Sequence, residues 1–146
     1  VAKPGTRSSA LIASIDFYPT LLEALGLRPR PGQRFDGQSI VPALRGEPLG
    51  RDTVFCHFPH YIPANGNRPA TYVRKGHWKL IRFYADQDDQ TDRFELYDLA
   101  ADLGETKDLA AVYPEKLKEL QAAYREWDAK NIPPKWFDGR RKPNAR

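Results

Sequence analysis

The chain has 146 residues, of which 40% are hydrophobic and 29% charged, so it is long enough for one globular domain, or one domain and a small piece of another. No apolar run approaches the ~20 residues that cross a bilayer, and Cys56 is the single cysteine, so a membrane span and an internal disulfide are both excluded. The net charge of +4 lies entirely in residues 132–146. The neutral remainder lacks the clustered basic face that a nucleic-acid partner requires.

The N-terminal third is predicted to be helical, with irregular connections. Ser14 or Asp16 caps a helix that runs to about Ala24. The apolar positions of this helix share one face, and they are Phe17, Leu21, Leu22 and Leu25. Two prolines and two glycines make residues 27–37 a loop, and a second, short helix is expected over residues 39–45.

The middle of the chain is typical of a small antiparallel sheet. Short segments rich in β-branched and aromatic residues predict strands at residues 53–58, 70–74, 77–84 and 94–99. A long helix is expected from Pro114 to about Asn131, and its apolar stripe must cover the sheet. The predicted fold class is α+β: about four antiparallel strands with a long C-terminal helix on one face, preceded by a helical N-terminal segment.

Two histidines leave the first strand and enter a loop rich in proline and glycine, where functional sites are common. His57 and His60 could donate hydrogen bonds to an anionic or hydroxylated ligand, or one could act as acid or base near neutral pH. The alternative is that both rings pack at a sheet edge. Cys56 precedes His57, but neighbours along a strand point to opposite faces, so Cys56 is interpreted as a small buried thiol in a strand.

Other polar clusters are weaker candidates. Arg74 could clamp an anion or belong to a solvated strand edge. His77 lies beyond a turn from the other histidines, so a zinc site is not expected. An acidic loop lacks the glycine and the closing glutamate of a calcium loop, and its carboxylates are those of Asp86, Asp88, Asp89 and Asp92. No complete catalytic set stands out, so the residues resemble one wall of an enzyme's site.

Six motifs together resemble the C-terminal third of the arylsulfatase family. In chain order they are SIDFYPTLL at 14–22, FDGQS at 35–39, HFPHY at 57–61, VRKGHWKLI at 73–81, ELYDL at 95–99 and GETKDLA at 104–110. Their order and spacing fit from about Val1 to Trp127. The HFPHY form looks like bacterial secreted sulfatases in particular, which implies a periplasmic or extracellular location.

The resemblance implies an alkaline-phosphatase-like enzyme whose N-terminal α/β domain carries a formylglycine and a calcium ion. Cys56 is followed by HFPH rather than by the Cys/Ser-x-Pro-x-Arg pattern, so neither the nucleophile nor the metal ligands are expected in this chain. His57 and His60 match a family position where a histidine reaches the substrate pocket. Arg74 matches a position that either contacts substrate or pins the hairpin. These three are the expected substrate-binding residues.

The same resemblance divides the chain. Residues 1–52 are expected to end the α/β catalytic domain, 53–131 to form the C-terminal sulfatase subdomain, and 132–146 to form a basic, flexible tail. The expected partners are the rest of the catalytic domain and a sulfated carbohydrate or aryl sulfate, with self-association through an exposed apolar sheet face and with neither nucleic acid nor membrane. The chain is thus interpreted as the C-terminal portion of a sulfatase, inactive alone. The alternatives are a non-catalytic binding module and part of a phosphoester or phosphonate hydrolase of the same superfamily.

Overall fold

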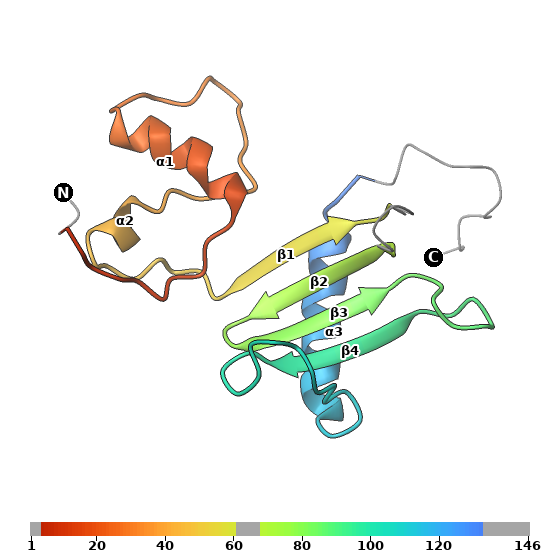
Figure 1. The fold of residues 1–146 in the computed structure, drawn as a ribbon. Helices are drawn as coiled ribbons and strands as arrows, with labels where there is room; N and C mark the ends of the chain where they lie inside the picture. Colours follow the sequence, from red (N-terminus) through yellow and green to blue (C-terminus); the bar gives the residue numbers. More distant parts are fainter. Residues whose placement is uncertain (1–3, 61–67, 133–146) are drawn as a thin grey trace.

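The computed structural model describes residues 4–60 and 68–132. A helical N-terminal segment lies beside a four-stranded sheet, and a long helix crosses behind the sheet (Figure 1). The elements are η1 (Ser14–Asp16), α1 (Phe17–Ala24), α2 (Val41–Leu44), β1 (Thr53–Phe58), β2 (Ala70–Lys75), β3 (Trp78–Phe83), β4 (Arg93–Asp98) and α3 (Pro114–Asp128). The predicted α+β class is confirmed. Within the described ranges, no helix is both long and apolar enough to cross a bilayer.

The sheet is an antiparallel meander in which each strand pairs with its neighbour in sequence, in the order β1-β2-β3-β4. In the pairing between β2 and β3, Val73 lies opposite Leu80, and in the next pairing Leu80 lies opposite Leu96. The tight turn between β2 and β3 contains Gly76, whose positive φ of 58° suits a hairpin of this kind. Each predicted strand bound agrees with the structure to within one residue.

The hydrophobic core lies between the sheet and α3. Its five buried members come from β2, β3, β4 and α3, and they are Val73, Leu80, Leu96, Leu120 and Tyr124. At the edge of the core, the Phe55 ring stacks on the Trp127 ring with 4.9 Å between centroids and 4° between planes. The predicted apolar stripe on the last helix therefore covers the sheet as expected, although α3 ends at Asp128 rather than near Asn131.

A buried carboxylate organises the N-terminal segment. Asp16 is fully buried, and the Arg51 guanidinium donates to its two oxygens at 2.9 and 2.5 Å. The backbone amides of Ala13 and Gln38 also donate to it, at 2.7 and 3.0 Å. These contacts lower the pKa of Asp16 to about 2, and the hydrogen bond from Arg51 is the largest cause. Asp16, predicted only as a helix cap, thus joins three separate stretches of chain.

The exposed apolar side chains are concentrated in the N-terminal segment. Phe17, Leu21 and Leu25 on and after α1 are 54%, 58% and 70% exposed. The sheet face away from α3 instead carries ion pairs, such as Lys79 with Glu105 at 2.7 Å. This face carries both charged and apolar side chains, since alternation places Lys79, Ile81 and Phe83 on it together, and the expected self-association through it stays a prediction.

Candidate functional site

His57 lies near the end of β1, on the sheet face that α3 covers. It is two residues after Phe55, which packs against the core, and alternation gives both side chains the same face. Cys56 belongs to the opposite face, where it lies across from Tyr72. The two adjacent side chains therefore do not form a nucleophile and base pair, as the sequence indicates.

The Nδ1 atom of His57 contacts hydroxyl groups from two other strand segments. It lies 2.8 Å from Oγ1 of Thr71 in β2 and 3.1 Å from the hydroxyl of Tyr84, just after β3. The two hydroxyls are 2.6 Å apart, and Tyr84 is 3.0 Å from the hydroxyl of Tyr124 in α3. We call these four side chains the His57 cluster. It ties the end of β1 to β2, to the end of β3 and to the helix.

A guanidinium group sets the charge beside this cluster. The central carbon of Arg82 lies 4.6 Å from the Tyr84 ring centroid and 5.2 Å from that of Tyr124. Burial is the main cause that lowers the pKa of His57, and the charge of Arg82 lowers it further, while Asp128 opposes them. Burial also raises the pKa of Tyr84. The lowered pKa of His57 therefore favours an uncharged imidazole in the cluster at neutral pH.

His60 lies beyond the end of β1 and is exposed. Its ring approaches the Phe58 ring edge-on, with 5.7 Å between centroids. It also contributes to the lowered pKa of His57, so the two histidines belong to the same end of the sheet. The last residue of the HFPHY motif, Tyr61, lies outside the described part of the chain.

Arg74 does not join the two histidines. It belongs to the sheet face opposite the core residue Val73, and its Nε donates to the carbonyl of Gly76 at 3.1 Å. Three residues of extended strand, or about 10 Å, separate it from Thr71, the cross-strand partner of His57. A single sulfate group therefore cannot contact both His57 and Arg74 in this fold.

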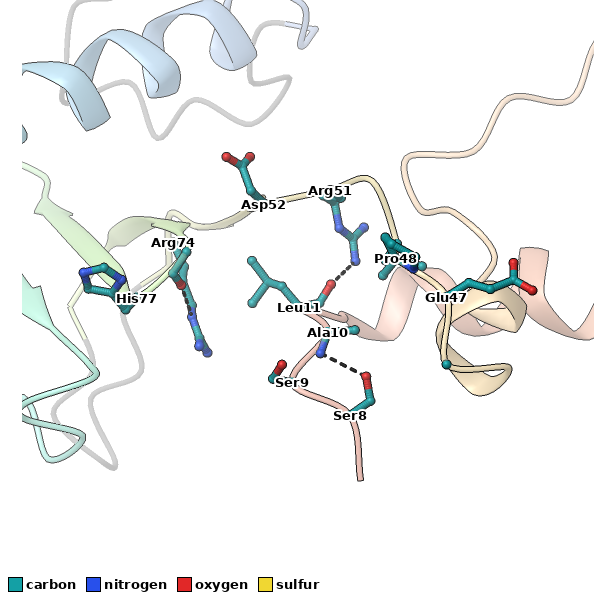
Figure 2. Close-up of a pocket in the computed structure, with 13 residues that line it drawn as sticks. Ser8, Ser9, Ala10, Leu11, Glu47, Pro48, Arg51, Asp52, Arg74 and His77 are labelled. Carbon is teal, nitrogen blue, oxygen red and sulfur yellow. Dashed lines mark hydrogen bonds between the residues drawn. The ribbon is translucent and has the colours of Figure 1, made fainter. Parts of the chain in front are cut away.

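Arg74 instead borders an open depression of about 550 Å³ between the N-terminal segment and the turn after β2. Figure 2 shows the side chain reaching toward Ser9 and Leu11, with His77 on its other side. Arg51 also lines this depression, but one of its nitrogens donates to the Leu11 carbonyl at 2.8 Å. The depression thus marks the junction between the helical segment and the sheet.

The acidic loop does not fit a calcium ion. Asp86 is paired with Arg93 at 2.7 Å and also with Arg68, and Asp92 is paired with Arg82. Arginines thus neutralise two of the four carboxylates of this loop, those of Asp86 and Asp92. In residues 4–60 and 68–132, no group of three or more His, Cys, Asp or Glu side chains is arranged to hold a metal.

The hydroxyl partners of His57 are not predicted by the sequence. Alternation along β3 does place Tyr84 on the same face as Arg82, and the same rule places Thr71 with Val73. That signal gives the face but not the register between strands. Because Tyr124 comes from α3, its contact with Tyr84 depends on how the helix crosses the sheet, which periodicity does not specify.

Comparison with known sequences gives a family match over most of the chain. The profile of the family described as "N-sulphoglucosamine sulphohydrolase, C-terminal" matches residues 1–129. A sulfatase of Formosa agariphila is 37% identical over 138 residues, which cover 84% of this chain and 24% of that protein. Arylsulfatase K of Homo sapiens is 29% identical over 118 residues, covering 77% of this chain and 21% of that protein. Because relatives occur in bacteria and animals, the likeness to bacterial secreted sulfatases does not assign a bacterial source.

Solved structures share the fold. One, in complex with its substrate D-glucosamine-2-N,6-O-disulfate, superposes with a TM-score of 0.73 at 30% identity, covering 88% of this chain and 26% of that one. The phosphonate monoester hydrolase of Agrobacterium radiobacter gives a TM-score of 0.58 at 28% identity, covering 80% and 25%. The chain thus spans about a quarter of the length of the proteins it matches.

Proposed function

Since this chain belongs to the N-sulphoglucosamine sulphohydrolase C-terminal family, we propose that it supplies a wall of the substrate pocket in a longer sulfatase. The supporting observation is the position of His57 and His60, which lie together at the end of β1 where the strand enters a loop. The sequence contains no Cys/Ser-x-Pro-x-Arg pattern for the formylglycine. We therefore place the formylglycine and the calcium ion in the part of the longer protein outside this chain.

The proposed substrate is a sulfated carbohydrate or an aryl sulfate. Imidazole N–H groups can donate to the oxygens of a sulfate or of a sugar hydroxyl, and a relative of the same fold binds a glucosamine disulfate. Arg74 is not part of this wall, because its guanidinium lies on the other face and bonds the Gly76 carbonyl. We propose that Arg74 stabilises the turn between β2 and β3 through this hydrogen bond. A periplasmic or extracellular location remains part of the proposal.

Alanine substitution of the two histidines in the full-length protein tests this function. If each donates a hydrogen bond to a charged sulfate oxygen, His57→Ala and His60→Ala should each raise KM for a sulfated sugar about ten-fold or more. His77→Ala is the matched control, because His77 is exposed at the opposite end of the sheet. Equal KM values for all three variants and the unmodified protein would refute the proposed wall.

The likeness to a phosphonate monoester hydrolase supports a second candidate, in which the longer protein cleaves phosphoesters or phosphonates. Sulfate esters, phosphoesters and phosphonates all present negatively charged oxygens that accept hydrogen bonds, so the histidines do not distinguish between these substrates. Activity of the full-length protein on a matched pair of aryl sulfate and aryl phosphonate substrates distinguishes the two candidates. Preference for the phosphonate in kcat/KM would favour the second candidate.

The third candidate function is that of a non-catalytic binding module. The coding sequence upstream separates it from the enzyme piece. A Cys/Ser-x-Pro-x-Arg pattern in the same reading frame supports the sulfatase, and a stop codon or a new start directly before this segment supports the module.

A further inference from the structure

We propose that Thr71, Tyr84 and Tyr124 form a hydrogen-bond relay that holds His57 as the tautomer protonated on Nε2, with Nε2–H as the donor to a ligand oxygen. The relay itself follows from the geometry of the four side chains. Only the identity of the oxygen, as part of a sulfated substrate, rests on the proposed function. Thr71, Tyr84 and Tyr124 are positioning residues, since they act through His57.

The hydroxyl protons can be assigned without leaving any unpaired. Thr71 donates to Nδ1 of His57 over 2.8 Å, Tyr84 donates to Thr71 over 2.6 Å, and Tyr124 donates to Tyr84 over 3.0 Å. Each of the three protons then has an acceptor, and the lone pair of Nδ1 has a donor. Tyr84 lies 3.1 Å from Nδ1, so its one proton could reach this lone pair as an alternative to Thr71.

The opposite tautomer, protonated on Nδ1, leaves one hydroxyl proton of the cluster without an acceptor. With hydrogen on Nδ1 the cluster holds four protons, and Nδ1 no longer accepts, so one hydroxyl of the three lacks an acceptor among the described side chains. Arg82, which covers both tyrosine rings, is itself a donor and cannot accept that proton. Thr71 and Tyr124 are only 1% and 6% exposed, so water reaches these two hydroxyls poorly, whereas Tyr84 is half-buried. A buried unpaired donor is costly enough to bias the tautomers by about ten-fold or more.

Nε2 is then the functional end of the ring. The Nδ1 edge of the His57 ring packs against the cluster, although the residue as a whole is exposed, and in the described residues no side chain accepts from Nε2. The charges around the ring are those of Arg82 on β3 and Asp128 on α3, with His60 beyond β1. Arg82 and His60 oppose a second ring proton, whereas Asp128 favours it. His57 therefore binds an acceptor oxygen as a neutral donor and does not act as a base through Nε2.

Nuclear magnetic resonance of ¹⁵N-histidine in this chain tests the relay directly. Near neutral pH, His57 should show one tautomer, with the proton on Nε2, whereas the exposed His77 should show averaged tautomers. Thr71→Val should leave the His57 tautomer in place, because Tyr84 still reaches Nδ1. The double variant Thr71→Val with Tyr84→Phe should give averaged tautomers, and Tyr18→Phe on α1 is the matched control.

Two results would overturn the relay: averaged tautomers at His57 in the unmodified chain, or an unchanged tautomer in a folded double variant. The measurement on the unmodified chain stands even if the double variant unfolds. The substrate role has a separate test in the full-length protein. His57→Gln keeps an N–H near the Nε2 position and His57→Asn keeps one near Nδ1, so kcat/KM should fall about ten-fold more for Asn than for Gln. Equal losses of kcat/KM in the two variants would show that Nε2–H does not donate to a substrate oxygen. The hydrogen-bond relay to Nδ1 would not be affected by this result.

Discussion

At the residue scale, the buried pair of Asp16 and Arg51 holds together separate parts of the N-terminal segment. The carboxylate has no exposed surface and receives four hydrogen bonds, two of them from Arg51. A buried pair of this kind adds little net stability, but removing one partner leaves the other charge unsatisfied. The pair should therefore be sensitive to substitution and to acid.

Asp16→Asn should reduce the free energy of unfolding of the N-terminal segment by about 3–5 kcal/mol at neutral pH, because Arg51 loses its carboxylate partner. The folded pKa of Asp16, about 2, lies below its ordinary value of 3.8. The stabilisation is thus complete above about pH 4 and is lost as the pH falls towards 2. Hydrogen exchange of the Gln38 amide measures it, since that amide donates to Asp16.

Asp36→Asn is the control for this experiment, because Asp36 is an exposed aspartate in the same segment. The difference between the two variants should shrink on acidification. A difference that stays constant down to pH 2 would show that the Asp16 carboxylate is not the titrating group.

At the scale of the elements, α3 is held by a small number of fully buried side chains. Leu120 has no exposed surface and lies among Val73, Leu80 and Leu96. Leu120→Ala should lower the free energy of unfolding by about 2–5 kcal/mol, since it removes packed atoms and leaves a cavity. Urea unfolding followed by circular dichroism provides the measurement.

Lys118→Ala in the same helix is the matched comparison. Its ammonium pairs with Glu115 at 2.9 Å, and both side chains are exposed. Pairs of this kind contribute about 1 kcal/mol or less. Similar losses for Leu120→Ala and Lys118→Ala would mean that α3 is not anchored through its buried stripe.

The elements also show how far sequence reasoning extends. Alternation and the turn at Gly76 predict the strands and the shared face of Trp78 and Leu80, because these signals are local. The contacts of His57 with Thr71 and Tyr84 depend on strand register, and the Asp16–Arg51 pair joins positions 35 apart in sequence. The sequence thus predicts the histidines as candidates, but neither their hydroxyl partners nor the separation of Arg74 from them.

At the scale of the whole molecule, the exposed face of α1 should govern association of the isolated chain. Leu21 and Leu25 belong to a group of apolar side chains that are about half exposed or more. Concentration-dependent self-association is therefore expected, measured by analytical ultracentrifugation, and the double variant Leu21→Glu with Leu25→Glu should reduce it.

Leu103→Glu is the control, since Leu103 is 81% exposed but lies in a loop after β4. It should leave association unchanged. A clean monomer of the unmodified chain at high concentration would contradict this prediction, and so would an effect of Leu103→Glu equal to that of the α1 variant.

The isolated chain should not hydrolyse p-nitrophenyl sulfate, because its sequence has no formylglycine pattern. Release of p-nitrophenol by the purified 146-residue chain measures this. Turnover that persists in His57→Ala and follows the chain through purification would contradict the assignment of the chemistry to residues outside it.

The meander order of the sheet has a consequence for how such proteins diversify. The β1–β2 and β3–β4 connections leave from the same end of the sheet, because Phe58 and Phe83 both lie opposite Ala70. An insertion in either connection lengthens a hairpin without rethreading the chain or shifting the register. His57 and Tyr84 lie at this end, next to the points where the two connections begin, whereas β1 joins the helical segment at the opposite end. Evolution can therefore change the lengths of the connections beside the histidines without changing the strands that position them.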